Sequence, residues 1–394
     1  MDKTTVVHII TKLELGGAQQ NTLFTVTHLD RGAYNPVLIS GSEGILVEEA
    51  KRLTDVNVHL LPDLVREIRP FKDIRAFTKM RRIIKQVQKG VNSSKIIVHT
   101  HSSKAGILGR WAARLAGVRL IVHSVHGFSF NAYQPSLVRA FYVFLERLTE
   151  RITTAFVTVS EADREEGIAK GIFKREDVTL VRSGIDIKRF CDLSCDSIAF
   201  RKKLGVDRDA PVVAMVACFK PQKAPLDFVR VAKVVLDERS DARFILVGDG
   251  LLRPQVETLL DQLKIADKVV LLGWRRDIPE IMHSINILLL TSLWEGLPRV
   301  LPQAMASGSP VVATSVNGSP EAVKNGLNGY LLPPGDVEGM ARKILYLINN
   351  PGEARAMGQT GRELVEEFDI WKMVKQQELL YANLTAGGAL DGAG

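Results

Sequence analysis

The chain has 394 residues, of which 46% are hydrophobic and 24% are charged, a composition that suits two globular domains of ordinary size. No uninterrupted apolar run approaches the roughly 20 residues of a membrane-spanning helix. The net charge of +8 indicates an anionic partner without choosing among a phosphorylated substrate, nucleic acid and anionic lipid.

Short β-branched runs alternate with amphipathic helical stretches along the chain, which is typical of parallel sheets covered by helices on both faces. In the first half we expect strands at Val6–Ile10, Pro36–Ser40, Lys95–Thr100, Leu120–Val125, Ala155–Val159 and Val178–Val181. The same alternation begins again in the second half, where we expect strands at Val212–Ala217, Arg243–Val247, Lys268–Leu272, Ile285–Leu290 and Pro310–Ala313. The pattern predicts two doubly wound α/β domains.

The first strand starts almost at the N-terminus, leaving no room for a secretory leader, so we expect a cytoplasmic protein. We place the domain boundary near Asp186, with domains at 1–185 and 186–370. Residues 371–384 predict a C-terminal helix that packs back on the first domain, and the Gly-rich tail 385–394 is expected to be disordered. The three cysteines match neither a disulfide framework nor a two-pair zinc site, so we interpret them as incidental. They are Cys191, Cys195 and Cys218.

The segment from Ile285 to Thr314 is the most informative. A buried strand gives way to a loop from Trp294 to Leu301, and Pro302 is expected to open a short helix. Open α/β sheets bind ligands at such strand ends, and a helix N-terminus suits a phosphate. Glu295 lies in the loop and Gln303 in the first helical turn, so we expect both side chains to point into one crevice.

From Ser292-Leu-Trp-Glu-Gly-Leu-Pro through Gln303-Ala-Met-Ala-Ser-Gly-Ser-Pro-Val-Val-Ala-Thr, this segment resembles the signature of glycosyltransferase family 4. The resemblance implies the GT-B fold, two facing Rossmann-like domains with a cleft between them, and transfer with retained anomeric configuration. In that family one Glu lies by the transferred sugar and a second, after seven residues, binds the ribose. Glu295 matches the first position, whereas Gln303 replaces the second and can still accept or donate a hydrogen bond. The same resemblance assigns the remaining loop residues to the donor site: Gly296, Leu297, Pro298 and Arg299.

Other residues of the second half resemble the family's donor site. Lys223 matches the family's diphosphate lysine, and Lys220 is the candidate substitute for its arginine. The alternative is two solvated surface lysines. Gly248 and Asp249 follow a strand, as in the family's nucleotide loop, but no third glycine completes a dinucleotide fingerprint. Arg275 is assigned to the base pocket. Its neighbour Trp274 lies either in that pocket or in the core.

In the first domain, Gly16 and Gly17 resemble the family's N-terminal glycine turn, where positive φ would let the backbone approach a ligand; a tight turn without a ligand is the alternative. His126 resembles the family's histidine that hydrogen-bonds a donor sugar. The nearby histidines raise the alternative of a metal site, which we do not favour because no carboxylate or thiolate cluster accompanies them. They are His99, His101, His123 and His126. For His99 and His123 we expect core positions.

A helix is expected from Pro70 to Lys89, with one basic and one apolar face. Its basic residues are Lys72, Arg75, Lys79, Arg82, Lys85 and Lys89, and its apolar residues are Ile74, Phe77, Met80, Ile84 and Val87. The basic face is either simply solvated or, as in related enzymes, a surface that docks on anionic lipid at the inner face of the membrane.

The resemblance implies a retaining glycosyltransferase that needs no metal or cofactor, with His126, Glu295 and Lys223 in catalytic roles. Its donor would be a nucleotide diphosphate sugar, UDP-linked by family habit. Its acceptor would be a glycan or a lipid-linked precursor, and we expect no nucleic-acid partner. Two alternatives stay open, a non-catalytic nucleotide-sugar-binding protein and a nicotinamide-dependent oxidoreductase.

Overall fold

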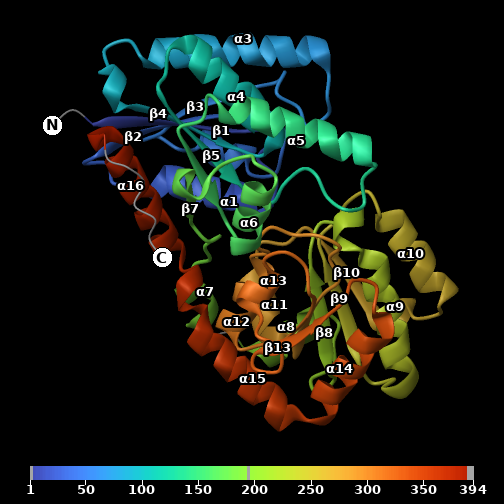
Figure 1. The fold of residues 1–394 in the computed structure, drawn as a ribbon. Helices are drawn as coiled ribbons and strands as arrows, with labels where there is room; N and C mark the ends of the chain where they lie inside the picture. Colours follow the sequence, from blue (N-terminus) through green and yellow to red (C-terminus); the bar gives the residue numbers. More distant parts are fainter. Residues whose placement is uncertain (1–2, 193–195, 388–394) are drawn as a thin grey trace. The chain divides into compact units, whose positions relative to one another are not determined.

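The computed structural model describes residues 3–192 and 196–387, which form two compact units (Figure 1). The described residues up to Gly184 and from Ile370 onward form the first unit, and Ile185–Asp369 forms the second. Each unit contains one sheet whose strands pair in parallel. Cys195 and residues 388–394 of the expected tail lie outside the described residues.

The seven strands of the first unit have the order β3-β2-β1-β4-β5-β6-β7. Their bounds are β1 Thr4–Ile10, β2 Tyr34–Gly41, β3 Asn57–Leu61, β4 Ile96–His101, β5 Leu120–Val125, β6 Ala155–Thr158 and β7 Val178–Leu180. The central strands β1 and β4 are buried along their whole length because helices cover both faces. In their register, His8 of β1 lies opposite His99 of β4.

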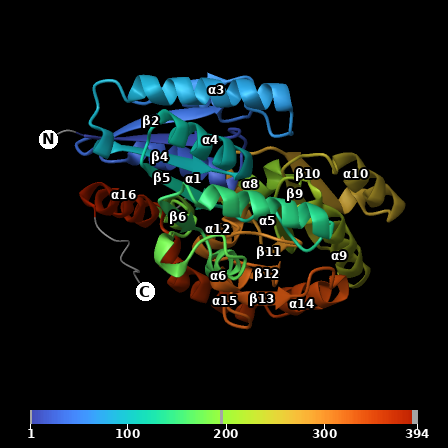
Figure 2. The same ribbon diagram turned by 45° about the horizontal axis from the view of Figure 1, so that its top comes forward.

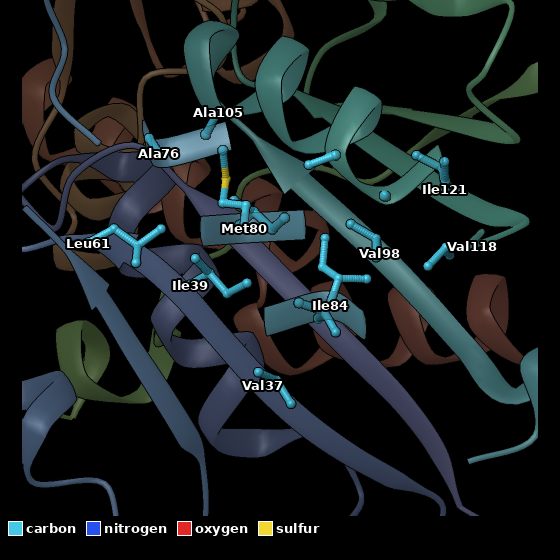
Figure 3. Packing of buried hydrophobic residues seen from close by; sticks show 14 of the residues in the cluster. Val37, Ile39, Leu61, Ala76, Met80, Ile84, Val98, Ala105, Val118 and Ile121 are labelled. Atoms are coloured by element: carbon cyan, nitrogen blue, oxygen red, sulfur yellow. The ribbon is translucent and has the colours of Figure 1, made fainter. Parts of the chain in front are cut away.

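The helices of this unit are α1 Gly17–His28, α2 Val47–Lys51, α3 Pro70–Val87, α4 Ser103–Ala116, α5 Ser136–Glu150, α6 Glu161–Ala169 and α16 Ile370–Ala386. Helices α3 and α4 cover one face of the sheet, and α5 packs beside α4 (Figure 2). Met80 and Ile84 point from α3 toward Ile39 and Val98 of the sheet (Figure 3). On the other face, α16 packs its apolar side on β1, β4 and β5.

The six strands of the second unit have the order β10-β9-β8-β11-β12-β13. Their bounds are β8 Val212–Val216, β9 Arg243–Val247, β10 Val269–Gly273, β11 Ile287–Leu290, β12 Val311–Thr314 and β13 Gly329–Leu332. The helices are α7 Ile187–Cys191, α8 Ser197–Lys203, α9 Pro225–Glu238, α10 Arg253–Gln262, α11 Ile278–Ser284, α12 Val300–Ser307, α13 Ser319–Ala322, α14 Val337–Asn349 and α15 Pro351–Leu364. The fold class predicted from the alternating pattern, two doubly wound α/β domains, is confirmed.

Three expectations need correction. Ile74 was assigned to the apolar face of the basic helix, but its side chain is exposed because α3 turns only Ala76, Met80 and Ile84 fully into the core. Strands β3 and β13 were not expected at all. The stretch between Ser183 and Pro211, around the expected domain boundary near Asp186, contains two short helices that the pattern did not predict, α7 and α8.

Candidate active site

The second sheet reverses its winding at β8. The chain moves outward from β8 to β9 and β10, then returns to place β11 on the other side of β8. In doubly wound sheets, ligands bind beyond the carboxyl ends of the strands at such a switch point. The loop after β8 carries Lys220 and Lys223, and the loop after β11 carries Glu295.

Lys223 and Glu295 form an ion pair between Nζ and Oε1. The Glu295 residue is only 7% exposed, whereas 17% of the Lys223 side chain is exposed. A buried carboxylate is costly without a counter-charge, so the pair satisfies Glu295 while leaving the ammonium group near solvent. These two residues, 72 positions apart, are therefore in direct contact, and the alternative of a solvated surface lysine is wrong for Lys223.

Side-chain and backbone hydrogen bonds hold the two loops together. Thr291 Oγ1 donates to the carbonyl oxygens of Lys223 and Ala224, both at 3.0 Å. Gln222 Nε2 donates to the Trp294 carbonyl at 2.8 Å, and Leu293 N–H donates to the Gln222 carbonyl at 2.7 Å. Ala224 has φ +43°, a strained conformation for a residue with a Cβ. The loop that positions Lys223 is thus fixed by several independent contacts.

The backbone N–H of Glu295 donates to Asn317 Oδ1 at 3.2 Å. The carbonyl of Gly296 accepts from Gly318 N–H at 3.0 Å. Leu297 and Pro298 are buried, so this stretch is a packed loop rather than a mobile one. Asn317 was missed from the sequence, and nothing in its spacing marks it as the partner of this loop.

The loop after β9 approaches the same end of the sheet. Gly248 has φ +126°, and a Cβ at this position would lie 2.0 Å from the carbonyl oxygen of Ala217, so only glycine fits. The carbonyl of Asp249 accepts from Phe219 N–H at 2.9 Å, which places this loop beside the one that carries Lys220. The Asp249 carboxylate pairs with Arg253 at 3.1 Å.

Helix α12 begins at Val300, so Pro302 is its third residue and does not open it as expected. Proline is tolerated there because the first amides of a helix have no intrahelical acceptor. Arg299 precedes the helix, and burial lowers its pKa to about 10. Gln303 lies in the first turn and is half-buried.

Arg275 follows β10 and pairs with Asp277, with Nε to Oδ1 at 2.7 Å. This guanidinium lowers the pKa of the Asp277 carboxyl. Trp274 is 41% exposed, so its assignment to the core is wrong.

In the first unit, Gly16 and Gly17 lie at the start of α1, and neither has the positive φ that was expected. Gly16 has φ −129°, an extended conformation open to any residue. Its lack of a side chain instead makes room for Gln19, whose Oε1 would lie 2.4 Å from a Cβ. Backbone conformation therefore gives no reason for these glycines, and the contact at Gly16 is only with the movable amide end of the Gln19 side chain.

His126 follows β5 and is half-buried, and its Nε2 lies 3.2 Å from His101 Nδ1. Burial lowers its pKa to about 4, so the imidazole is neutral near pH 7. His99 and His123 are buried core histidines, as expected. His99 bonds Tyr381 and Ser124, and His123 bonds Thr100.

Among the described residues, one histidine group has the spacing of a metal site. The ring nitrogens of His8, His99 and His101 lie within 4.8 Å of one another. Both nitrogens of His99 and of His101 already make hydrogen bonds, leaving only His8 Nε2 without a partner. A metal would have to break several of these bonds, so hydrogen bonding explains the group. His8 was missed because it lies within a fully buried strand.

Two family models match the chain. The model described as Glycosyl transferase 4-like domain covers residues 13–184, and the model described as Glycosyl transferases group 1 covers residues 196–364. The part of the chain that the structure describes has no helix long and apolar enough to span a membrane.

Similar proteins support the same family. The UDP-Gal:alpha-D-GlcNAc-diphosphoundecaprenol alpha-1,3-galactosyltransferase of Escherichia coli is 30% identical over 385 residues, 97% of each chain. The N-acetyl-alpha-D-glucosaminyl L-malate synthase of Bacillus anthracis is 30% identical over 291 residues, 72% of this chain and 74% of the relative. The structure of HepE from Anabaena in complex with UDP and glucose superimposes with a TM-score of 0.81 at 20% identity, covering 96% of this chain and 100% of HepE. The chain therefore belongs to glycosyltransferase family 4, and it is a glycosyltransferase with the GT-B fold.

Proposed function

We propose that this enzyme transfers a sugar, with retention and without a metal ion, from a nucleotide diphosphate sugar to a glycan or lipid-linked acceptor. The observation that carries this proposal is the Lys223–Glu295 ion pair at the switch point of the second sheet. It supplies a cation for the diphosphate and a carboxylate for the sugar at one place.

When the donor binds, it replaces the contact between Lys223 and Glu295 with a contact of its own to each residue. Its diphosphate takes up the Lys223 ammonium group, assisted by Lys220 from the same loop, and the Glu295 carboxylate then lies beside the sugar. Charge grows on the diphosphate as the glycosidic bond breaks, so Lys223 stabilises the transition state more than the bound donor. Glu295 stabilises the positive charge that develops at the anomeric carbon.

Retention follows if the acceptor attacks on the face that the diphosphate leaves. The departing diphosphate oxygen takes the acceptor proton, so no separate protein base is needed. His126 hydrogen-bonds a hydroxyl of the transferred sugar, and Gln303 bonds the ribose. The Gln303 amide takes the place of the family's ribose-binding carboxylate, and its hydrogen bond contributes about 0.5–1.5 kcal/mol to donor binding.

The relatives guide the choice of substrates. The name of the Escherichia coli relative gives UDP-galactose as donor and an N-acetylglucosamine diphosphate lipid as acceptor. The Bacillus anthracis relative is named for a malate product, so acceptors differ within the family. We therefore take a uridine donor and a lipid diphosphate acceptor as the first pair to test.

The test follows UDP release from UDP-galactose, UDP-glucose and UDP-N-acetylglucosamine with a short-chain N-acetylglucosamine diphosphate lipid. Proton coupling at the anomeric carbon of the product should show the configuration of the donor, and excess EDTA should leave the rate unchanged. Lys223→Ala should lose turnover, whereas Lys202→Ala, an exposed lysine on α8, should not. An inverted product would refute retention, and a loss of rate in EDTA would refute metal independence.

We also propose that the first unit docks on an anionic membrane. Helix α5 exposes a continuous apolar stripe at helical spacing: Leu137, Phe141, Phe144 and Leu148. Exposed apolar stripes of this kind are typical of helices that lie in a lipid interface.

Basic side chains lie near this stripe, on α3. Helix α3 packs against α4, and α4 in turn packs against α5. Among the described residues, four basic side chains of α3 have no ion-pair partner: Lys72, Arg81, Arg82 and Lys85. The start of α3 also exposes Phe71 and Ile74. Each basic residue near an anionic surface contributes about 1 kcal/mol. Attraction by charge and burial of apolar side chains therefore favour the same partner.

Vesicle co-sedimentation separates these two contributions. Arg82→Glu/Lys85→Glu should reduce binding to anionic vesicles mainly at low salt, because surface charge is screened within about 8 Å at physiological ionic strength. Phe141→Ser/Phe144→Ser should reduce binding at every salt concentration. The charge-matched control Lys202→Glu, in the second unit, should bind normally. Equal binding to neutral and anionic vesicles would contradict docking by charge.

A further inference from the structure

Three histidines of the first unit form a hydrogen-bonded chain that starts at His126 and runs into the core. His126 Nε2 lies 3.2 Å from His101 Nδ1, and His101 Nε2 lies 3.1 Å from His8 Nδ1. His101 is 2% exposed and His8 is completely buried. The two end atoms, His126 Nδ1 and His8 Nε2, are buried and have no hydrogen-bond partner.

The rings of this chain are neutral, because burial lowers the pKa of His8 to about 3, that of His126 to about 4 and that of His101 well below 6.5. A neutral imidazole carries one N–H and one bare nitrogen. Each of the two hydrogen bonds therefore needs an N–H on one side and a lone pair on the other. Both bonds can form only if all three rings adopt the same tautomer.

The two arrangements differ in which end carries the unpaired N–H. If every ring is protonated on Nε2, that group is the Nε2–H of His8, fully buried and facing no acceptor. If every ring is protonated on Nδ1, it is the Nδ1–H of His126. Buried N–H groups without an acceptor are rarer in proteins than acceptors without a donor.

The surroundings of His126 favour the second arrangement. Its ring lines a cavity of about 10 Å³ together with polar side chains that include Asn21 and Thr25. The side-chain oxygens of both residues are buried and have no partner. The cavity thus contains acceptors for an N–H and also an unpartnered donor, Asn21 Nδ2, so it suits His126 Nδ1 in either state, whereas an Nε2–H on His8 would have no acceptor.

We infer that His101 and His8 are positioning residues that fix His126 as the Nδ1–H tautomer, so that Nδ1, the ring nitrogen of His126 outside this chain of bonds, is a hydrogen-bond donor. A neighbouring set of contacts holds His101 in place. The His99 ring lies 4.3 Å from the His101 ring, and His99 is fixed by Tyr381 and Ser124 at 2.5 and 2.7 Å. Any group that reaches this nitrogen is then an acceptor rather than a donor: a side-chain oxygen of Asn21 or Thr25 in the cavity, or a sugar hydroxyl oxygen in the donor complex.

Nitrogen-15 NMR of the full-length protein labelled at histidine reports the tautomer directly. The chain has eight histidines, and the signals of His126 are those lost in His126→Gln. Wild-type His126 should show a protonated Nδ1 and a bare Nε2. His101→Phe should shift it toward the Nε2–H form that isolated imidazoles prefer, whereas His123→Asn, outside the chain of bonds, should leave it unchanged.

A wild-type His126 protonated on Nε2 would overturn the inference without any variant. So would a folded His101→Phe protein that keeps the Nδ1–H form. If His101→Phe does not fold, His8→Gln is the second variant, and it should give a mixture of tautomers at His126.

The effect on catalysis rests on the proposed function, whereas the NMR result does not. In a transfer assay, His101→Phe should lower kcat/KM about five- to tenfold, the loss of one well-placed hydrogen bond. His126→Ala should lower it at least as much, and His123→Asn should not. The predicted tautomer with an unchanged rate in both His101→Phe and His126→Ala would refute only the contact with the sugar.

Discussion

Replacing Lys223 and replacing Glu295 should lower the free energy of unfolding by different amounts, although both substitutions break the same ion pair. Removing one partner of a buried ion pair typically destabilises a protein by about 3–5 kcal/mol, because the other charge is left without compensation. In Lys223→Met the remaining carboxylate is almost completely buried, so we expect about 3 kcal/mol. In Glu295→Gln the remaining ammonium is partly exposed and can turn toward solvent, so we expect about 1–2 kcal/mol.

A double-mutant cycle tests this asymmetry. Scanning calorimetry of the wild type, both single variants and Lys223→Met/Glu295→Gln gives the coupling free energy, which should be about 1–3 kcal/mol. Saturating UDP should reduce the coupling, because the diphosphate competes with Glu295 for Lys223. Strictly additive single variants would refute the ion pair, and a coupling unaffected by UDP would refute the exchange of partners.

Three further predictions concern donor affinity, pH and a backbone position. Gln303→Ala should raise the Kd for UDP about two- to tenfold in calorimetry, whereas Gln303→Glu should bind as well as wild type or better; unchanged affinity in Gln303→Ala would exclude the ribose contact. Burial lowers the pKa of His8 and His126 to about 3 and 4, so below pH 6.5 the unfolded chain binds more protons than the folded chain. The free energy of unfolding should therefore fall as the pH drops from about 6 to 4.5, by up to about 1.4 kcal/mol per pH unit for each histidine, and His8→Phe should flatten this slope in denaturation series. Gly248→Ala should destabilise the protein by about 3 kcal/mol through strain and the clash with Ala217, while Gly352→Ala, where nothing lies within 4 Å, should be tolerated; a stable Gly248→Ala would contradict the loop geometry.

The strands that the sequence pattern missed are both edge strands. In β3 only Leu61 is buried, and in β13 only Gly329 is, so neither has the continuous apolar run of the central strands. Central parallel strands are covered on both faces and read as unbroken β-branched runs, which is why their positions could be predicted. The other two edge strands, β7 and β10, are equally half-solvated, but they keep runs of Val and Leu and could therefore be predicted.

The candidate site was predictable where spacing along one segment determines it. Glu295 and Gln303 follow from the loop and helix that begin after a single strand. The contact of Glu295 with Lys223 depends instead on β11 returning beside β8, which no local motif encodes. The family assignment removes the nicotinamide-dependent alternative.

The histidine chain shows a second limit. His8 looks like an ordinary residue of a buried strand, and its role appears only when the register of β1 and β4 brings it beside His101. Gly16 shows the converse, since its glycine was attributed to positive φ but the residue has an extended conformation that any residue can adopt. Neither the partner of His8 nor the φ of Gly16 could be predicted from the local sequence.

The most direct test of the central claim compares donor binding with turnover in Glu295→Gln. The variant keeps the shape of the side chain but removes the negative charge that should face the sugar in the transition state. Calorimetric titration should give a donor Kd within about threefold of wild type, while initial-rate kinetics at saturating donor should give a kcat lower by about a hundredfold or more. Normal turnover in a folded Glu295→Gln protein would contradict the assignment of the Lys223–Glu295 site as the place where the sugar is transferred.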